Sequence, residues 1–126
     1  MKKGLLVIGL AASLSCGSVF ADWENTGNEL MRQCAVGLKW LNDPESITQT
    51  MDFVSMTACS EYIRGVGGAM NAASVACVPS SVEVGQLVRI VSNYGREHPL
   101  ILDKSKLALA GLAIQSAYPC SAGANK

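Results

Sequence analysis

The chain has 126 residues, and its ten basic and ten acidic side chains give a net charge of zero at neutral pH. This balance leaves no basic surface that could follow a phosphate backbone, so we expect no nucleic-acid partner. The single histidine argues against a histidine-rich metal site, and the length is that of one domain.

The first 21 residues have the pattern of a cleaved Sec signal peptide. Lys2 and Lys3 precede an apolar stretch, residues 4–14, that is too short to span a bilayer. Val19 and Ala21 are the small residues that signal peptidase requires. We therefore predict export and cleavage after Ala21.

Cleavage would leave one mature domain, residues 22–126. Its net charge would be about −2, because both lysines leave and all ten acidic residues stay. The alternative is a lipoprotein acylated at Cys16, which the preceding Ser13-Leu14-Ser15 disfavours. No later segment approaches the ~20 apolar residues of a membrane span, so we expect no membrane association after cleavage.

The first predicted helix is "NELMRQCAVGLKWL". Thr26 and Glu29 form a capping box at its start, and Asn42-Asp43-Pro44 ends it. Between these signals, apolar residues recur at helical spacing.

The second predicted helix starts near Ser46 or soon after and runs to about Ala76. Its apolar face consists of Cys59, Tyr62, Ile63, Val66 and Met70. A face of small residues beside it is expected to let a neighbouring helix approach closely: Gly65, Gly68, Ala69, Ala72 and Ala76. A third face is left for solvent: Ser60, Arg64, Gly67 and Asn71. The alternative use of the glycines is a hinge or break at residues 65–68.

Two further helices follow. Ser80 and Glu83 form a second capping-box pattern, and His98-Pro99 ends the third helix. Asp103 is the expected N-cap of the fourth helix, which stops at Pro119-Cys120. Because no β alternation of useful length is present, we predict an all-α fold, a small bundle of four or slightly more helices.

Removal of Cys16 leaves four cysteines, and an even count in a small exported chain predicts two disulfides. On one continuous helix, Cys59 and Cys77 would lie about 27 Å apart. A disulfide needs Cα atoms within about 7 Å, so these two are not expected to pair. Two pairings survive. We favour Cys34–Cys59 with Cys77–Cys120 over Cys34–Cys77 with Cys59–Cys120.

No catalytic or cofactor pattern is present. His98 suits a helix C-terminus, Ser80 and Ser81 suit caps, and Glu61 and Glu83 are isolated, with no paired group of the kind that acid–base catalysis uses. The cysteines form no C-x-x-C motif, so neither a metal nor another cofactor is expected. We predict a binding protein rather than an enzyme.

The motifs "CSEYIRGVGGAM", "CVPSSVEVGQLVRIVSNYGREHP" and "AYPC", with "GNELMRQC" before them, resemble the Rap/Tai family. These are immunity proteins for amidase effectors of the type VI secretion system. The resemblance spans about Gly27 to Cys120. It implies a periplasmic, helical, disulfide-bonded domain that occludes the active site of a peptidoglycan amidase of the NlpC/P60 type and thereby protects the cell and its kin.

The matching residues are interpreted mainly as scaffold: Cys34, Cys59, Tyr62, Gly65, Cys77, Pro79, Gln86, Leu87, Pro99, Pro119 and Cys120. Candidates for contact with the partner are exposed polar helix faces, the connectors 42–46 and 98–103, and the apolar "HPLILD" loop. The named candidates are Arg64, Asn71, Arg89, Asn93, Arg96, Leu100 and Ile101. The loop is either packed into the core or an interaction surface.

Two other functions remain open. A periplasmic acid-stress chaperone would also be short, helical and disulfide-bonded, and would open in acid. The chain could equally be an orphan family member with another binding role. Association as a homodimer also stays open.

Overall fold

The computed structural model describes residues 25–121, and the predicted signal peptide, its cleavage site and Cys16 lie outside this range. The described part contains four α-helices and two short 3-10 helices: α1 (Gly27–Asn42), η2 (Pro44–Ser46), α2 (Thr50–Ala72), α3 (Val84–Glu97), η3 (Pro99–Ile101) and α4 (Lys106–Ala117). Among these residues the one extended pairing is an isolated bridge between Thr26 and Ser105. The predicted all-α, four-helix fold is confirmed.

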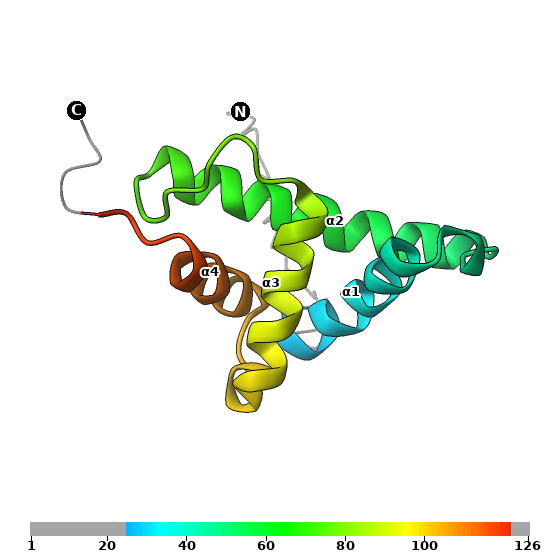
Figure 1. The fold of residues 1–126 in the computed structure, drawn as a ribbon. Helices are drawn as coiled ribbons and strands as arrows, with labels where there is room; N and C mark the ends of the chain where they lie inside the picture. The colour runs from blue at the N-terminus through cyan, green and yellow to red at the C-terminus, as the bar shows by residue number, and fades with distance from the viewer. Residues whose placement is uncertain (1–24, 122–126) are drawn as a thin grey trace, which may run out of the picture.

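The helices are arranged around α3. In Figure 1, α2 spans the width of the molecule, and α3 runs from α2 down to the lower corner, with α1 on one side and α4 on the other. All four helices contact one another. The core therefore lies where they meet, and the connection between α3 and α4 lies at the far end from α2.

The core is built from the apolar stripes that the helical periodicity indicates. Burying each large aliphatic side chain contributes about 1.5–3 kcal/mol. The largest apolar side chains that are completely buried are Leu30, Ile63, Val91, Leu109 and Ile114, each 0% exposed. Every one of the four helices supplies at least one of them, so the bundle has a single shared core.

Both disulfides have the favoured pairing. Cys34–Cys59, with Cα atoms 5.1 Å apart, joins α1 to α2 inside the core. Cys77–Cys120, with Cα atoms 4.9 Å apart, joins the segment after α2 to the segment after α4. The Cys77 amide also donates to the Tyr118 carbonyl at 2.8 Å. The segments that follow α2 and α4 are thus joined both by a disulfide and by a backbone hydrogen bond.

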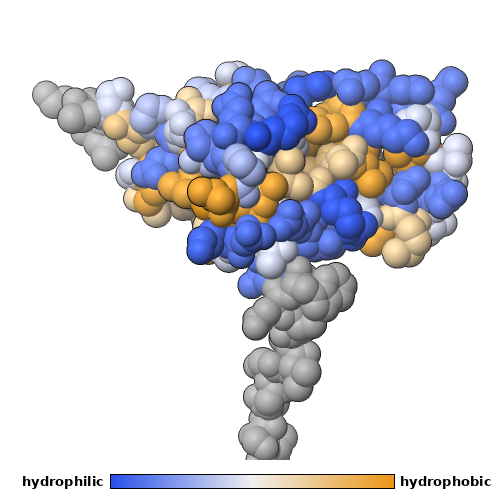
Figure 2. All heavy atoms as spheres, turned by 90° about the horizontal axis from the view of Figure 1, so that it is seen from below, coloured by the Kyte–Doolittle hydropathy of each residue, from blue (hydrophilic) through white to orange (hydrophobic). Residues whose placement is uncertain are grey.

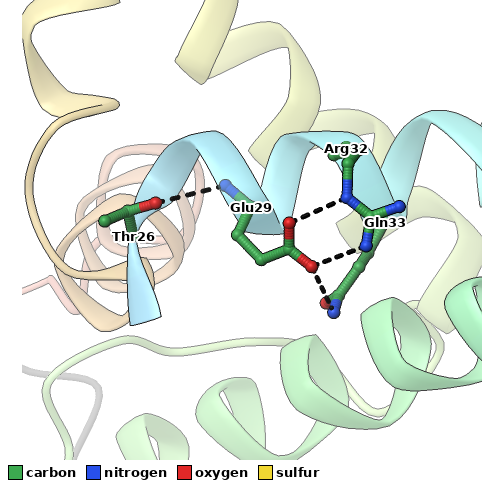
Figure 3. A network of polar contacts seen from close by, with 4 residues as sticks. All are labelled: Thr26, Glu29, Arg32 and Gln33. Carbon is green, nitrogen blue, oxygen red and sulfur yellow. Dashed lines mark hydrogen bonds and ion pairs between the residues drawn. The ribbon is translucent and has the colours of Figure 1, made fainter. Parts of the chain in front are cut away.

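The N-terminus of α1 confirms the predicted Thr26 cap. The Thr26 hydroxyl accepts from the Glu29 amide at 3.3 Å (Figure 3). The Glu29 carboxylate accepts from Arg32 Nε at 2.8 Å and from Gln33 Nε2 at 3.1 Å. The hydrogen bonds from Arg32 are the main cause of a pKa of Glu29 below its ordinary value.

The predicted end of the second helix is wrong. The helix α2 ends at Ala72, because Ser74 adopts a left-handed conformation with φ of 56° that no α-helix continues. The amides of Val75 and Ala76 both donate to the Met70 carbonyl, at 2.9 and 3.3 Å, and close the turn. Cys77 therefore lies outside the helix. The separation of Cys59 and Cys77 along one helix axis, which was used to exclude their pairing, does not apply, although the favoured pairing is present.

The predicted packing role of the small residues is also wrong. A Cβ on Gly65 or Gly68 would meet nothing within 4 Å, and Ala69 and Ala72 are exposed. Gly67, which was assigned to solvent, is buried, and a Cβ there would stand 3.4 Å from Leu87 Cδ1.

The reason is the side from which the neighbouring helices approach. The core covers the face of α2 that contains Cys59, Ile63 and Val66, and Gly67 adjoins that face while Gly65 lies opposite. Of the predicted small face, only Ala76 is buried, and it lies beyond the helix. The helix α2 is continuous through residues 65–68, so the hinge alternative is not observed either.

Two predicted caps differ from the structure. Ser80 does not cap α3, which starts at Val84 with Glu83 as an N-cap that makes no side-chain bond. Ser105 rather than Asp103 caps α4, and its hydroxyl accepts from the Ala108 amide at 3.1 Å. Asp103 instead accepts from Asn28 in α1. The predicted end of α3 at His98-Pro99 is confirmed.

Candidate functional site

The connection between α3 and α4 projects an apolar side chain into solvent. We call residues 98–103 the Leu100 turn. Leu100 is 85% exposed, the largest value among the exposed large hydrophobic residues of the described part. Figure 1 places this connection at the lower corner of the molecule. Single exposed leucines are common on protein surfaces, so it is the position of Leu100 on a protruding turn that makes it a candidate contact residue.

The Leu100 turn is firmly attached to the start of α1. The Gly27 amide donates to the Lys104 carbonyl at 2.8 Å, and the Asn28 amide donates to the Leu102 carbonyl at 2.9 Å. Asn28 Nδ2 also donates to Asp103 Oδ1 at 3.2 Å. A loop that is fixed before binding loses little conformational entropy when a partner engages it.

The apolar residues of the turn have two different roles. Ile101 and Leu102 are partly buried and pack against the core, whereas Leu100 points away from it. The core-packed alternative for the "HPLILD" loop therefore holds for Ile101 and Leu102, whereas Leu100 is exposed. The inward pair holds the turn in place, and Leu100 is left available.

The C-terminus of α3 stiffens the other side of the turn. The His98 ring stacks on Tyr94, with ring centroids 4.0 Å apart. The His98 amide donates to the Tyr94 carbonyl at 2.9 Å, and its Nδ1 lies 3.0 Å from the same oxygen. His98 is thus the C-cap of α3, as its position before a proline indicates.

Three of the predicted contact residues follow one side of α3 toward the Leu100 turn. Arg89, Asn93 and Arg96 are exposed and are separated by four and three residues, so they share a helix face. Arg96 donates to Asn93, and Arg89 donates to Asn42 at the end of α1 at 3.4 Å. The face is polar and leads to an apolar tip.

The two predicted contact residues on α2 lie apart from this face. Asn71 accepts from the Val78 amide at 3.1 Å, so its side-chain oxygen holds the turn after α2. Arg64 lies 3.5 Å from Glu61 in an exposed ion pair. The structure therefore divides the predicted contact residues into two groups. One lies on α3 and the Leu100 turn, and the other lies on α2.

A groove lies beside Arg64, between α1, α2 and α3. We call it the Trp40 groove, after the half-exposed indole on its rim, and part of it encloses about 230 Å³. Two adjoining hollows share the following lining residues: Trp40, Leu41, Arg64, Val84 and Gly85. The sequence prediction did not include it. The sequence did contain a signal for this groove, because the large apolar side chain of Trp40 lies off the apolar stripe of its own helix.

A second groove lies on the other side of α2, against the start of α4. We call it the Tyr62 groove; it encloses about 390 Å³ and is lined by Glu61, Tyr62, Gly65, Val66, Ala69, Met70 and Leu107. The Lys106 ammonium lies 4.7 Å from the centroid of the Tyr62 ring. Burial raises the pKa of Tyr62. Leu107 is 58% exposed, so the groove has an uncovered apolar wall.

The remaining family-matching residues lie at joints of the scaffold. Gln86 donates to the Tyr118 hydroxyl at 3.1 Å and links α3 to the end of α4, and Leu87 is in the core. The prolines are at element boundaries: Pro79 after α2, Pro99 at the start of η3 and Pro119 beyond α4.

The surface gives no indication of a metal centre or a membrane span. Residues 25–121 contain no group of three or more His, Cys, Asp or Glu side chains placed to hold a metal ion. None of the helices in this range is long and apolar enough to cross a bilayer. Figure 2 shows hydrophobic atoms in separate patches between hydrophilic ones on the face seen from below.

The comparisons with known proteins gave one match. The family model described as Rap1a immunity proteins matches residues 26–120. No curated protein and no solved structure matched. The matched range begins at the Thr26 cap and ends at Cys120, so it covers the four helices and both disulfides.

Proposed function

The chain belongs to the Rap1a family of immunity proteins, and from this premise we propose that it inhibits a peptidoglycan amidase effector of the type VI secretion system. Membership in the family makes it an immunity protein against a secreted effector, and its partner is that cognate effector protein. Proteins of this family are generally not enzymes. The amidase and the compartment are the proposed part.

The sequence supports an amidase as the target. The motifs around Cys59, Cys77 and Cys120 resemble immunity proteins whose effectors are amidases of the NlpC/P60 type. Such an enzyme cleaves peptidoglycan in the periplasm, so an inhibitor must be present there.

Two features support a periplasmic location. The first 21 residues have the pattern of a signal peptide, and the domain has two disulfides, which persist in oxidising compartments.

The Leu100 turn is the element that we assign to the effector. An inhibitor that occludes an enzyme's cleft needs a convex, preformed projection, and Leu100 is 85% exposed on a turn that two hydrogen bonds attach to α1, with a third at the adjoining Lys104. The polar α3 face beside it would form the rim of the contact, and the leucine its apolar centre.

Inhibition of a purified amidase tests the proposal. The protein is titrated into a type VI NlpC/P60 effector encoded by the same cell, and release of peptidoglycan fragments is measured. We expect inhibition that is complete near one inhibitor per active site. Full amidase activity in the presence of excess protein, with no complex in size-exclusion chromatography, would overturn the amidase assignment.

A further inference from the structure

The exposed side of α3 presents two guanidinium groups that no carboxylate neutralises. Within residues 25–121 the structure has ion pairs on α1 and α2, and neither Arg89 nor Arg96 takes part in one. The whole chain has ten basic and ten acidic side chains, so the positive charge of this face is a local feature and not a consequence of net charge. Such a face attracts a partner that presents negative charge.

Neutral amides hold both guanidinium groups in place. Arg89 donates to the side-chain oxygen of Asn42 at 3.4 Å, and Arg96 donates to the side-chain oxygen of Asn93. An amide oxygen accepts a hydrogen bond but carries no charge, so each arginine is oriented while its positive charge stays uncompensated. Orientation before binding reduces the conformational entropy that a side chain loses in a contact.

The nearest acidic residues along the chain do not compensate this charge. Glu97 follows Arg96 directly, about 100° around the helix, and forms no ion pair with it. Asp103, in the Leu100 turn, accepts from Asn28 Nδ2 at 3.2 Å and is thus engaged with α1. The side of α3 that contains Arg89 and Arg96 therefore keeps its positive charge.

The two arginines also have a defined spacing and direction. They are seven residues apart on α3, which is two helical turns or about 10 Å along the axis. Arg96 lies in the last turn of the helix, so the line from Arg89 to Arg96 leads to the Leu100 turn. Guanidinium groups bind carboxylates through two parallel hydrogen bonds, which fixes the geometry of the contact as well as its charge.

We propose that this face of α3 recognises acidic side chains of the effector, with Arg89 and Arg96 each binding a carboxylate beside the cleft that Leu100 enters. The inference rests on the proposed function, because it adds the chemistry of the effector surface around that cleft. Charges at the rim of an interface mainly accelerate association, whereas the buried apolar centre determines the lifetime of the complex. The α3 face is thus assigned to association and Leu100 to lifetime.

Association kinetics with the type VI NlpC/P60 effector encoded by the same cell test the proposal. Arg89→Gln and Arg96→Gln together should slow association about tenfold at low salt and change the dissociation rate by less than about threefold. Raising the salt from about 50 mM to about 500 mM should slow the wild type and remove most of the difference, because exposed charges are then screened. Circular dichroism should show that the variants remain folded.

Arg64→Gln is the matched control, because Arg64 is an exposed arginine on α2 that is already paired with Glu61 at 3.5 Å. It should leave the association rate within about twofold of the wild type, whereas Arg89→Gln alone should slow association about threefold. Equal slowing by Arg64→Gln and Arg89→Gln would show that net charge drives association, and would overturn the proposal.

Wild-type association by the doubly substituted protein would overturn it as well. In both cases the wild-type protein still inhibits the amidase, so the proposed function stands. If the wild-type protein forms no complex with the amidase, the proposed function and this inference both fail.

Discussion

Gly27 lies against the backbone of Leu102 so closely that a Cβ on Gly27 would stand 3.0 Å from the Leu102 Cα and 3.1 Å from its carbonyl oxygen. This contact joins the first turn of α1 to the Leu100 turn. It lies beside the hydrogen bonds that the Gly27 and Asn28 amides donate to the carbonyls of Lys104 and Leu102. The glycine is needed here for close approach rather than for an unusual backbone angle. The position of Leu100 therefore depends on residue 27.

Gly27→Ala is expected to destabilise the protein by about 1–3 kcal/mol, because backbone atoms cannot move aside as a flexible side chain can. Urea denaturation measures the change. Gly68→Ala is the matched control, since a Cβ there meets nothing within 4 Å on an exposed helix face. It should stabilise the protein by about 0.5–1 kcal/mol through helix propensity. Equal effects of the two substitutions would contradict the close contact.

Ser92 offers a stabilising substitution. Its hydroxyl is buried in α3, with the residue 1% exposed, and makes no hydrogen bond. Since a buried unpaired hydroxyl costs about 1–3 kcal/mol of desolvation, Ser92→Ala should raise the free energy of unfolding by about 1 kcal/mol. Exposed Ser116→Ala on α4 should change it little. A clear loss of stability in Ser92→Ala would show that the hydroxyl does have a partner.

The two disulfides should differ in their resistance to reductant. Cys34 and Cys59 are both 0% exposed, whereas Cys77 and Cys120 are partly exposed. Thiolate attack needs access to sulfur, so dithiothreitol should reduce Cys77–Cys120 first. Alkylation followed by peptide mass spectrometry measures the order. Replacing Cys77 and Cys120 by serine should cost about 2–4 kcal/mol of stability. Faster labelling of Cys34 and Cys59 would contradict the burial.

The Glu29 carboxylate should make the fold weaker in acid. Arg32 lowers its pKa below 4.5 in the folded protein, so the unfolded chain binds more protons in that range. Its contribution is therefore fully present above about pH 4.5 and is lost as the pH falls through the folded pKa. Glu29→Gln should lower stability at pH 7 by about 0.5–1 kcal/mol and flatten the acid limb of the stability curve.

Denaturation midpoints of the wild type and Glu29→Gln between neutral and acid pH provide the measurement. An identical acid limb in both proteins would exclude Glu29 as a contributor. The same series addresses the chaperone alternative. That function predicts that acid opens the domain and that the open form holds unfolded clients, whereas an immunity protein needs only the closed fold.

Local signals in the sequence predicted much of the fold. Thr26 before Glu29 and His98 before Pro99 mark helix ends because their effects act within one turn. Helix geometry excluded a Cys59–Cys77 pair but left two pairings open, and it assumed a helix that in the structure ends before Cys77. The prediction for the small-residue face was wrong because helical periodicity shows which residues share a face, and not which neighbouring helix covers it. Gly67 is buried and Gly65 is exposed because of the side on which the other helices pack against α2.

The contact surface was harder to predict for the same reason. Leu100 and Ile101 are adjacent and equally apolar, yet one is 85% exposed and the other packs against the core. Asn71 looked like a free surface amide, but it holds the Val78 amide. Such differences arise from contacts between segments that are distant in sequence. The structure is needed to separate a projecting residue from a supporting one.

The most direct test of the account is the inhibition constant of Leu100→Asp against the cognate amidase. A central apolar contact residue carries about 2 kcal/mol or more, so we predict at least a roughly tenfold weaker inhibition. Leu112→Asp, which changes an exposed leucine on α4, should inhibit like the wild type, and both variants should have unchanged circular dichroism. Wild-type inhibition by folded Leu100→Asp would contradict the assignment of the Leu100 turn to the effector.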